Sequence, residues 1–152
     1  METKKTIDAL NELVVINNDR IAGYQTATDE TEEQDLKTLF SGFMRTSQNC
    51  KTELEGEINR LAGEVAEGTM TSGKFFRVWM DVKAALTGKD RKVILDSCEF
   101  GEDAAVKAYQ HALSEHLEDL SPDQQKLVRS QYTIIKADHD RVKSMRDALV
   151  TV

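Results

Sequence analysis

The stretch ILDSCEFGEDAAVKAYQHAL, residues 94–113, has the pattern of a helix whose apolar face contains a carboxylate. Spacings of three and four residues place six of its side chains on one face: Leu95, Cys98, Glu102, Ala105, Tyr109 and Ala112. Glu102, and Glu99 close to the same face, would therefore point toward the core of the protein. The environment of these carboxylates is the main question that the sequence raises.

Composition limits both the architecture and the partners. A chain of 152 residues is long enough for one core, so we expect residues 1–152 to form a single domain. One proline and eight glycines leave long stretches without a helix breaker. The net charge of −7 repels phosphate backbones, and no run rich in Lys and Arg interrupts it. Nucleic acid is therefore excluded as an expected partner.

Two further features concern location. The longest apolar run near the N-terminus, residues 13–16, is too short for a signal peptide or a membrane span. Cys50 and Cys98 lie within apolar helical stripes and form no CxxC pair, which is typical of free buried thiols in a reducing compartment. We therefore expect a cytoplasmic protein without membrane contact.

Four long amphipathic segments are predicted to be helices: residues 6–29, 33–62, 90–117, and 121 to near the C-terminus. Thr6 and Asp90 are expected N-caps, and Gly63 is the expected stop of the second helix. The segment SPDQ, residues 121–124, has the Ser, Pro and Gln positions of a capping box. No segment has the pattern of a strand.

The connection lengths predict the topology. Short links make the first and second helices, and the third and fourth, antiparallel neighbours. About 25 residues separate the second and third helices, and they include a predicted short helix at 74–86. Such a connection can return along the whole bundle. We therefore predict an all-α, ferritin-like four-helix bundle with a long crossover connection that carries an extra short helix. A five-helix up-and-down bundle is the alternative.

The topology places the inward polar residues at two levels. Equal rise per residue along each helix brings one group together: Asn17, Tyr24, Glu99, Glu102 and Asp138. A lower level contains Glu53, Glu57, Tyr109 and Gln131. Two kinds of carboxylate site are compatible with this arrangement, namely a metal site and a hydrogen-bond network.

The metal interpretation uses Glu99, Glu102 and Asp138, with Glu53 and Glu57 as weaker candidates, to bind a divalent iron or manganese ion. Ferritin-like di-iron proteins use Glu-x-x-His pairs. Here Ala108, Leu113 and Lys136 stand three residues before the histidines, so that motif is absent. A carboxylate-only site would be a departure, and we predict no cofactor.

The network interpretation, which we favour, needs no metal. Tyr24 or Tyr109 would donate to a carboxylate, and Asn17 or Gln131 would complete the hydrogen bonds, unless the carboxylate reaches solvent at the stripe's edge. A small molecule bound between the helices is a third possibility. No Ser-His-Asp order, phosphate loop or nucleotide-binding turn is present. An enzyme is therefore the less favoured class.

Three stretches resemble a known family: INNDRIAGY (16–24), RVWMDVKAALTGKD (77–90) and CEFGEDAAVKAY (98–109). In this order they resemble the bacterial, ferritin-like four-helix-bundle proteins known as domain of unknown function 2383. The resemblance extends over roughly residues 5–117 and implies a fold without an established activity. It also implies these signature positions: Asn18, Asp19, Gly23, Tyr24, Trp79, Asp81, Lys83, Glu99, Gly101, Glu102, Asp103 and Tyr109.

The leading functional hypothesis is a non-enzymatic cytoplasmic bundle that associates with itself or with a protein partner. The resemblance to ferritin-like proteins suggests a role in stress adaptation. The alternative is a carboxylate-bridged, di-iron or manganese oxidase or storage protein. A third hypothesis is a scaffold for a hydrophobic ligand or partner helix, bound at Phe75, Phe76, Val78 and Trp79 of the crossover.

Overall fold

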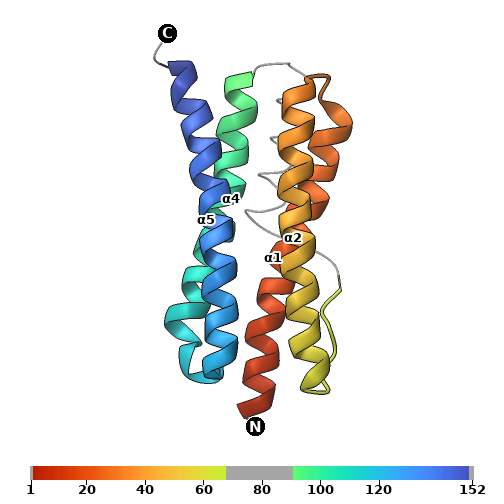
Figure 1. The fold of residues 1–152 in the computed structure, drawn as a ribbon, viewed down its shortest axis with the longest axis vertical. Coiled ribbons are helices and arrows are strands. Elements are labelled where there is room, and N and C mark those ends of the chain that lie inside the picture. Colours follow the sequence, from red (N-terminus) through yellow and green to blue (C-terminus); the bar gives the residue numbers. More distant parts are fainter. Residues whose placement is uncertain (1, 68–90, 151–152) are drawn as a thin grey trace.

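The computed structural model describes residues 2–67 and 91–150, which form four long helices and one short 3-10 helix (Figure 1). In chain order these elements are α1 (Glu2–Glu30), α2 (Gln34–Arg60), α4 (Arg91–Glu115), η1 (Leu117–Asp119) and α5 (Pro122–Val150). The predicted all-α four-helix bundle is confirmed. The short helix expected at 74–86 lies outside the described residues, and so do Asp90 and the residues that distinguish the five-helix alternative.

The helix directions agree with those predicted from the connection lengths. In Figure 1, α1 and α5 run upward and α2 and α4 run downward. Arg91, at the start of α4, donates to Asp35, at the start of α2, over 2.6 and 3.2 Å. Because their first turns meet, α2 and α4 are parallel, so the end of α2 and the start of α4 lie at opposite ends of the bundle.

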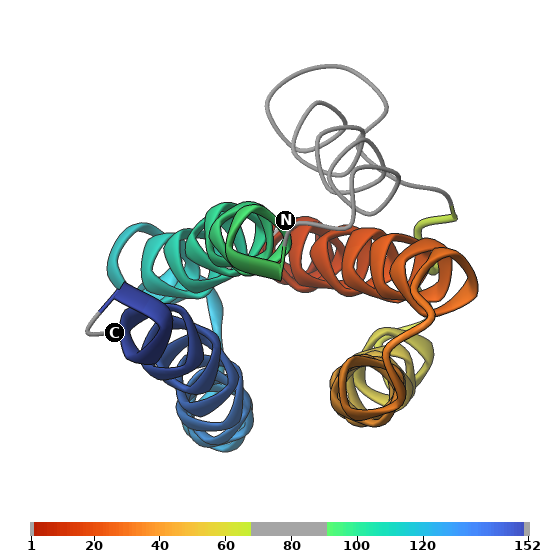
Figure 2. The same cartoon turned by 90° about the horizontal axis from the view of Figure 1, so that it is seen from above.

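The bundle consists of two antiparallel helix pairs. Packing is most extensive between α1 and α2 and between α4 and α5, and α1 also contacts α4 while α2 contacts α5. Seen from above, α1 and α4 lie side by side, and α2 and α5 lie on the same side of them (Figure 2). The inner faces of all four helices therefore surround one core.

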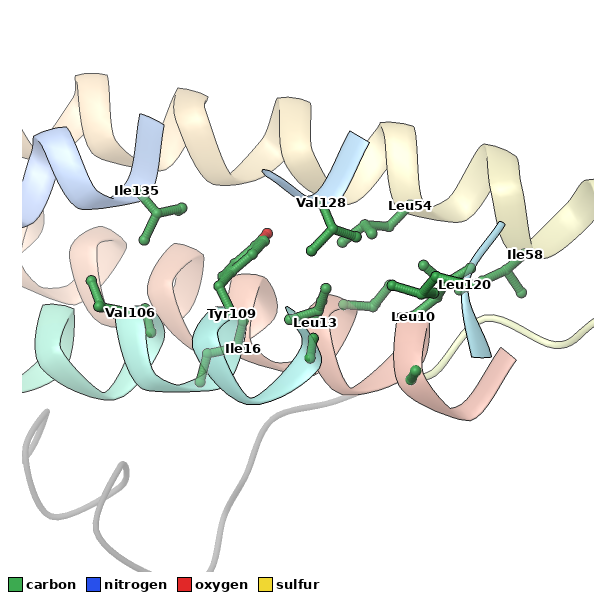
Figure 3. Packing of buried hydrophobic residues seen from close by; sticks show 14 residues of the cluster. Leu10, Leu13, Ile16, Leu54, Ile58, Val106, Tyr109, Leu120, Val128 and Ile135 are labelled. Carbon is green, nitrogen blue, oxygen red and sulfur yellow. The ribbon is translucent and has the colours of Figure 1, made fainter. Parts of the chain in front are cut away.

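The core is divided into two apolar clusters along the bundle. Figure 3 shows the cluster around Tyr109, in which large aliphatic side chains from all four helices interdigitate. The second cluster surrounds Tyr24, whose ring lies 5.4 Å from the ring of Phe40 and 5.2 Å from that of Phe43, measured between centroids. Each large buried side chain contributes about 1.5–3 kcal/mol to stability. Between the two clusters, each of the four long helices places polar side chains toward the core.

The helix starts test the predicted caps. The Ser121 amide donates to Gln124 Oε1 at 2.9 Å, and the Gln124 amide donates to Ser121 Oγ at 3.1 Å, so the predicted capping box is confirmed. The prediction for Thr6 was wrong. Helix α1 already begins at Glu2, and the buried Thr6 hydroxyl donates to the Asp119 carbonyl. A partner 113 residues away in sequence thus replaces the local cap.

Helix α2 ends at Arg60, two residues before the predicted end at residue 62. Ala62, with φ of 60°, adopts the left-handed conformation, and the Gly63 amide donates to the Ile58 carbonyl at 2.9 Å. These are features of a Schellman motif. A Cβ on Gly63 would lie 2.7 Å from Ile7 Cδ1, so this glycine serves the close approach to α1.

We predict that Ala62→Gly stabilises the protein by about 0.5–1 kcal/mol, because glycine adopts positive φ without steric cost. Urea unfolding followed by circular dichroism measures the change. Ala22→Gly, at an exposed position inside α1, is the matched control and should destabilise by a similar amount. A destabilised Ala62→Gly variant would contradict the assigned backbone conformation.

Candidate functional site

A layer of buried polar side chains separates the two apolar clusters. Each helix contributes to it: Arg20 and Tyr24 from α1, Ser47 from α2, Glu102 from α4 and Asp138 from α5. We call these five residues the ionic layer. The side chain of Arg20 is 0% exposed and that of Glu102 is 1% exposed, whereas Asp138 retains 17%. Such deep burial of charge is tolerated only when the charges are paired.

Arg20 is the centre of the ionic layer. Its Nη2 and Nε donate to Glu102 Oε1 at 2.7 and 3.2 Å, and Nη2 also lies 3.2 Å from Asp138 Oδ2. Its Nη1 donates to Ser47 Oγ at 2.7 Å. The Tyr24 hydroxyl donates to the same Glu102 oxygen at 2.5 Å. One guanidinium thus connects all four helices, which sets the register of the two helix pairs.

The charges of the layer do not balance, because two carboxylates surround one guanidinium. Burial disfavours the charged form of Arg20, but the field of Glu102, with smaller contributions from Tyr24 and Asp138, outweighs it and raises the pKa of Arg20. Burial raises the pKa of Asp138 to about 6; Arg20 opposes the rise and Glu102 adds to it. Burial and the Glu102 charge also raise the pKa of Tyr24 well above its ordinary value.

A second polar group lies about one helical turn below the ionic layer. Asn17 Nδ2 donates to the Tyr109 hydroxyl at 2.9 Å, and this hydroxyl donates to Gln131 Oε1 at 2.7 Å. Gln131 Nε2 then donates to the Cys50 carbonyl and to Glu53 Oε1, both at 3.1 Å. This series of hydrogen bonds again includes all four helices. It differs from the prediction in two respects: Tyr109 donates to an amide oxygen instead of a carboxylate, and Asn17 bonds to Tyr109 of the lower level instead of lying with Glu102.

The structure brings together some of the predicted carboxylates and separates others. Glu102 and Asp138 lie on one level, as expected, but they converge on Arg20. Glu99 points to the edge of α4 and pairs with Arg146. Glu53 accepts a hydrogen bond from Gln131, and Glu57 pairs with Arg60 at 2.5 Å on the surface. The five predicted ligands therefore lie in four different places.

A dinuclear metal centre does not fit the ionic layer. Its two carboxylates are bonded to a guanidinium, a permanent cation that cannot deprotonate to make room for metal ions. Among the described residues, the acceptor that remains buried without a partner there is Glu102 Oε2. A single spare oxygen beside a fixed positive charge is too few ligands for a carboxylate-bridged pair of ions.

The signature positions implied by the resemblance are spread along the bundle. Tyr24, Glu102 and Tyr109 belong to the two polar networks. Asp19, Gly23 and Gly101 are buried, and Asn18 is half-buried. Trp79, Asp81 and Lys83 lie outside the described residues. The sequence did not predict Arg20 as a core residue. The signal that could have found it is its position on the inward face, three residues after Asn17 and four before Tyr24.

Within the described part of the chain, two clefts border helix α2. The larger, about 550 Å³, lies between α2 and α5 and is lined by Thr38, Leu39, Phe43, Asp138 and Arg141 among others. The second, about 400 Å³, lies along the outer side of α2 and includes Lys37, Ser41 and Arg45. Thr38 and Gly42 line both clefts. Nothing lies within 4 Å of a Cβ built on Gly42, which is exposed.

Comparison with known proteins identifies the family. The sequence model described as Domain of unknown function (DUF2383) matches residues 5–115. The chain belongs to this family. The DUF2383 match includes Arg20, Tyr24, Ser47 and Glu102, whereas Asp138 lies beyond it on α5. The comparison with curated proteins gave no match. None of the described helices has the length and apolar character that crossing a membrane requires.

Proposed function

We propose that this DUF2383 protein is a non-catalytic bundle that works by self-association, and that two copies pair through helix α2. The observation that carries the proposal is Gly42, an exposed glycine inside a long helix with open space around a built Cβ. Glycine there costs about 1 kcal/mol of helix stability relative to alanine. Packing within the described residues does not require it, whereas a close helix–helix contact with a second copy would.

The residues around Gly42 support a symmetric contact. Asp35, Thr38, Gly42 and Arg45 follow one another at helical spacing, and we call this stripe the Gly42 face. In an antiparallel pair centred between Thr38 and Gly42, each threonine faces the glycine of the second copy. The same arrangement places Arg45 of each copy opposite the partner's Asp35, which also pairs with Arg91 of its own chain but remains 61% exposed. The face is thus complementary to itself in both shape and charge.

The interior supports a role without catalysis. The buried carboxylate Glu102 holds Arg20 and the Tyr24 hydroxyl, so it acts as a structural ion-pair partner. Cys50 and Cys98 are free and buried, as predicted. Burial raises the pKa of Cys50 to about 11 and raises that of Cys98 further, which disfavours the reactive thiolates. Two unreactive free thiols also fit the cytoplasmic location and the stress-related role that we propose.

Analytical ultracentrifugation tests the proposal. We predict that the wild-type chain sediments with twice its monomer mass of 17.1 kDa, and that Gly42→Leu sediments as the monomer. Leucine has open space at this position and a higher helix propensity, so the monomer fold should be retained and stabilised by about 1 kcal/mol.

Gly56→Leu is the matched control. Gly56 lies on the same helix, is exposed and also has nothing within 4 Å of a built Cβ, but it is about three turns beyond Arg45, the nearest residue of the Gly42 face. This variant should keep the wild-type mass. A monomeric wild-type protein would overturn self-association as the function. A dimer that Gly42→Leu leaves intact would instead overturn the assigned face.

A further inference from the structure

A cluster of three potential metal ligands lies outside the ionic layer, at the junction of α4 and α5. Glu99 and Asp103 are one turn apart on α4, and His139 is on α5. His139 Nε2 lies 2.5 Å from Asp103 Oδ1, and one ligand atom from each of the three residues lies within 4.8 Å of the other two. Glu102 and Asp138 take no part, because both point into the core.

The second nitrogen of the His139 ring is held by another carboxylate. Nδ1 lies 3.1 Å from Asp140 Oδ1, which also accepts a hydrogen bond from Lys136 Nζ at 2.9 Å. Histidines that bind metal ions usually donate their other ring N–H to a carboxylate or carbonyl, which fixes the tautomer and the ring orientation. The contact with Asp140 therefore leaves Nε2 directed toward Glu99 and Asp103 as the nitrogen for a metal.

Access and competing contacts are compatible with ion binding. The side chain of Asp103 is 46% exposed, whereas those of Glu99 and His139 are 14% and 12% exposed, so the cluster is open on one side. Arg146 pairs with Glu99 and would have to release it. After that release, Arg146 would still pair with Asp147 at 2.9 Å and with Asp96 at 3.5 Å. The loss of its pair with Glu99 would cost little, because a partly exposed ion pair contributes little to stability.

We propose that Glu99, Asp103 and His139 bind one divalent transition-metal ion, with two carboxylates and one imidazole nitrogen as the protein ligands. One nitrogen and two oxygen donors suit Zn²⁺, Mn²⁺ or Fe²⁺, and water completes the coordination. The ion joins α4 to α5 at the level of the ionic layer. This site does not depend on the proposed self-association. It differs from a dinuclear centre in the core because its ligands include His139 and Asp103, which lie outside the ionic layer.

Titration of the metal-free protein with ZnCl₂, followed by NMR of the imidazole rings, tests the site. The chain has three histidines, so each ring can be assigned by substitution. We expect the His139 signals to shift and to saturate at one equivalent of Zn²⁺. His139→Ala identifies the His139 signals. Asp103→Asn should abolish their shift, whereas Asp140→Asn should weaken Zn²⁺ binding by about 10–100-fold. Circular dichroism of each variant confirms that it is folded.

His116→Ala is the matched control, because His111 and His116 form a second histidine cluster with Glu12. This variant should leave the Zn²⁺-dependent shift of His139 unchanged. Two outcomes would overturn the proposal: His139 signals that do not move while those of His111 or His116 do, or a folded Asp103→Asn variant that binds Zn²⁺ as tightly as the wild type. MnCl₂ provides a second probe, since bound Mn²⁺ should broaden the same His139 signals.

Discussion

Arg20→Met is expected to reduce the free energy of unfolding by about 3–5 kcal/mol, because it leaves Glu102 and Asp138 buried beside each other without a cation. Methionine has a similar length and fills the space, so the loss reports the unpaired charges. Many domains of this size are stable by only 5–15 kcal/mol, so the effect is large. Urea unfolding at pH 7.5, measured at fixed protein concentration, gives the difference.

Two further variants separate charge pairing from other causes. Arg91→Met removes the partner of Asp35 at the surface, where Arg91 is 30% exposed, and should cost less than about 1 kcal/mol. Arg20→Met combined with Glu102→Met should recover at least half of the loss, since an apolar pair leaves fewer buried charges unpaired. An Arg20→Met variant no less stable than Arg91→Met would contradict the ionic layer.

The helices were predictable because their signals are local. Apolar spacing and the absence of breakers determined where each helix lies, and the capping box at Ser121 is complete within four residues. The errors occurred where a distant residue decides the local structure. Thr6 bonds to the Asp119 carbonyl instead of capping a helix, and Gly63 is needed because Ile7 approaches it. Neither contact can be read from the neighbouring sequence.

The two carboxylates of the ionic layer could be predicted from the sequence. Glu102 and Asp138 interrupt apolar stripes, and equal helical rise places them on one level. Glu99 is about 60° from Glu102 around the helix, enough to reach the edge of the core. Arg20 was missed because arginine is rarely buried unless it is paired, and its partners come from three other helices. The requirement for a buried cation follows only when both carboxylates are placed inside.

Asp138→Asn is expected to change the pH dependence of stability in a direction opposite to the usual one for a salt-bridged carboxylate. The pKa of Asp138 is about 6 in the folded protein, above its ordinary value of 3.8. The folded state therefore binds this proton more tightly. The associated stability is fully present below pH 3.8 and is lost as the pH rises through 6. Asparagine mimics the protonated form and should prevent that loss.

The expected gain for Asp138→Asn at pH 7.5 is about 2 kcal/mol at most, after reduction for solvent screening at the exposed edge of the carboxylate. Urea unfolding of both proteins with EDTA, from pH 4 to pH 7.5, should show curves that meet near pH 4 and diverge above it. Asp140→Asn is the control, because hydrogen bonds from Lys136 and His139 lower the pKa of Asp140, so this variant should be the less stable one above pH 4. Parallel curves for wild type and Asp138→Asn would mean that the attraction of Arg20 offsets burial and keeps the pKa of Asp138 near its ordinary value in the folded protein. Divergent curves would mean that the ionic layer carries one negative charge more than Arg20 can balance, and that it binds a proton near pH 6.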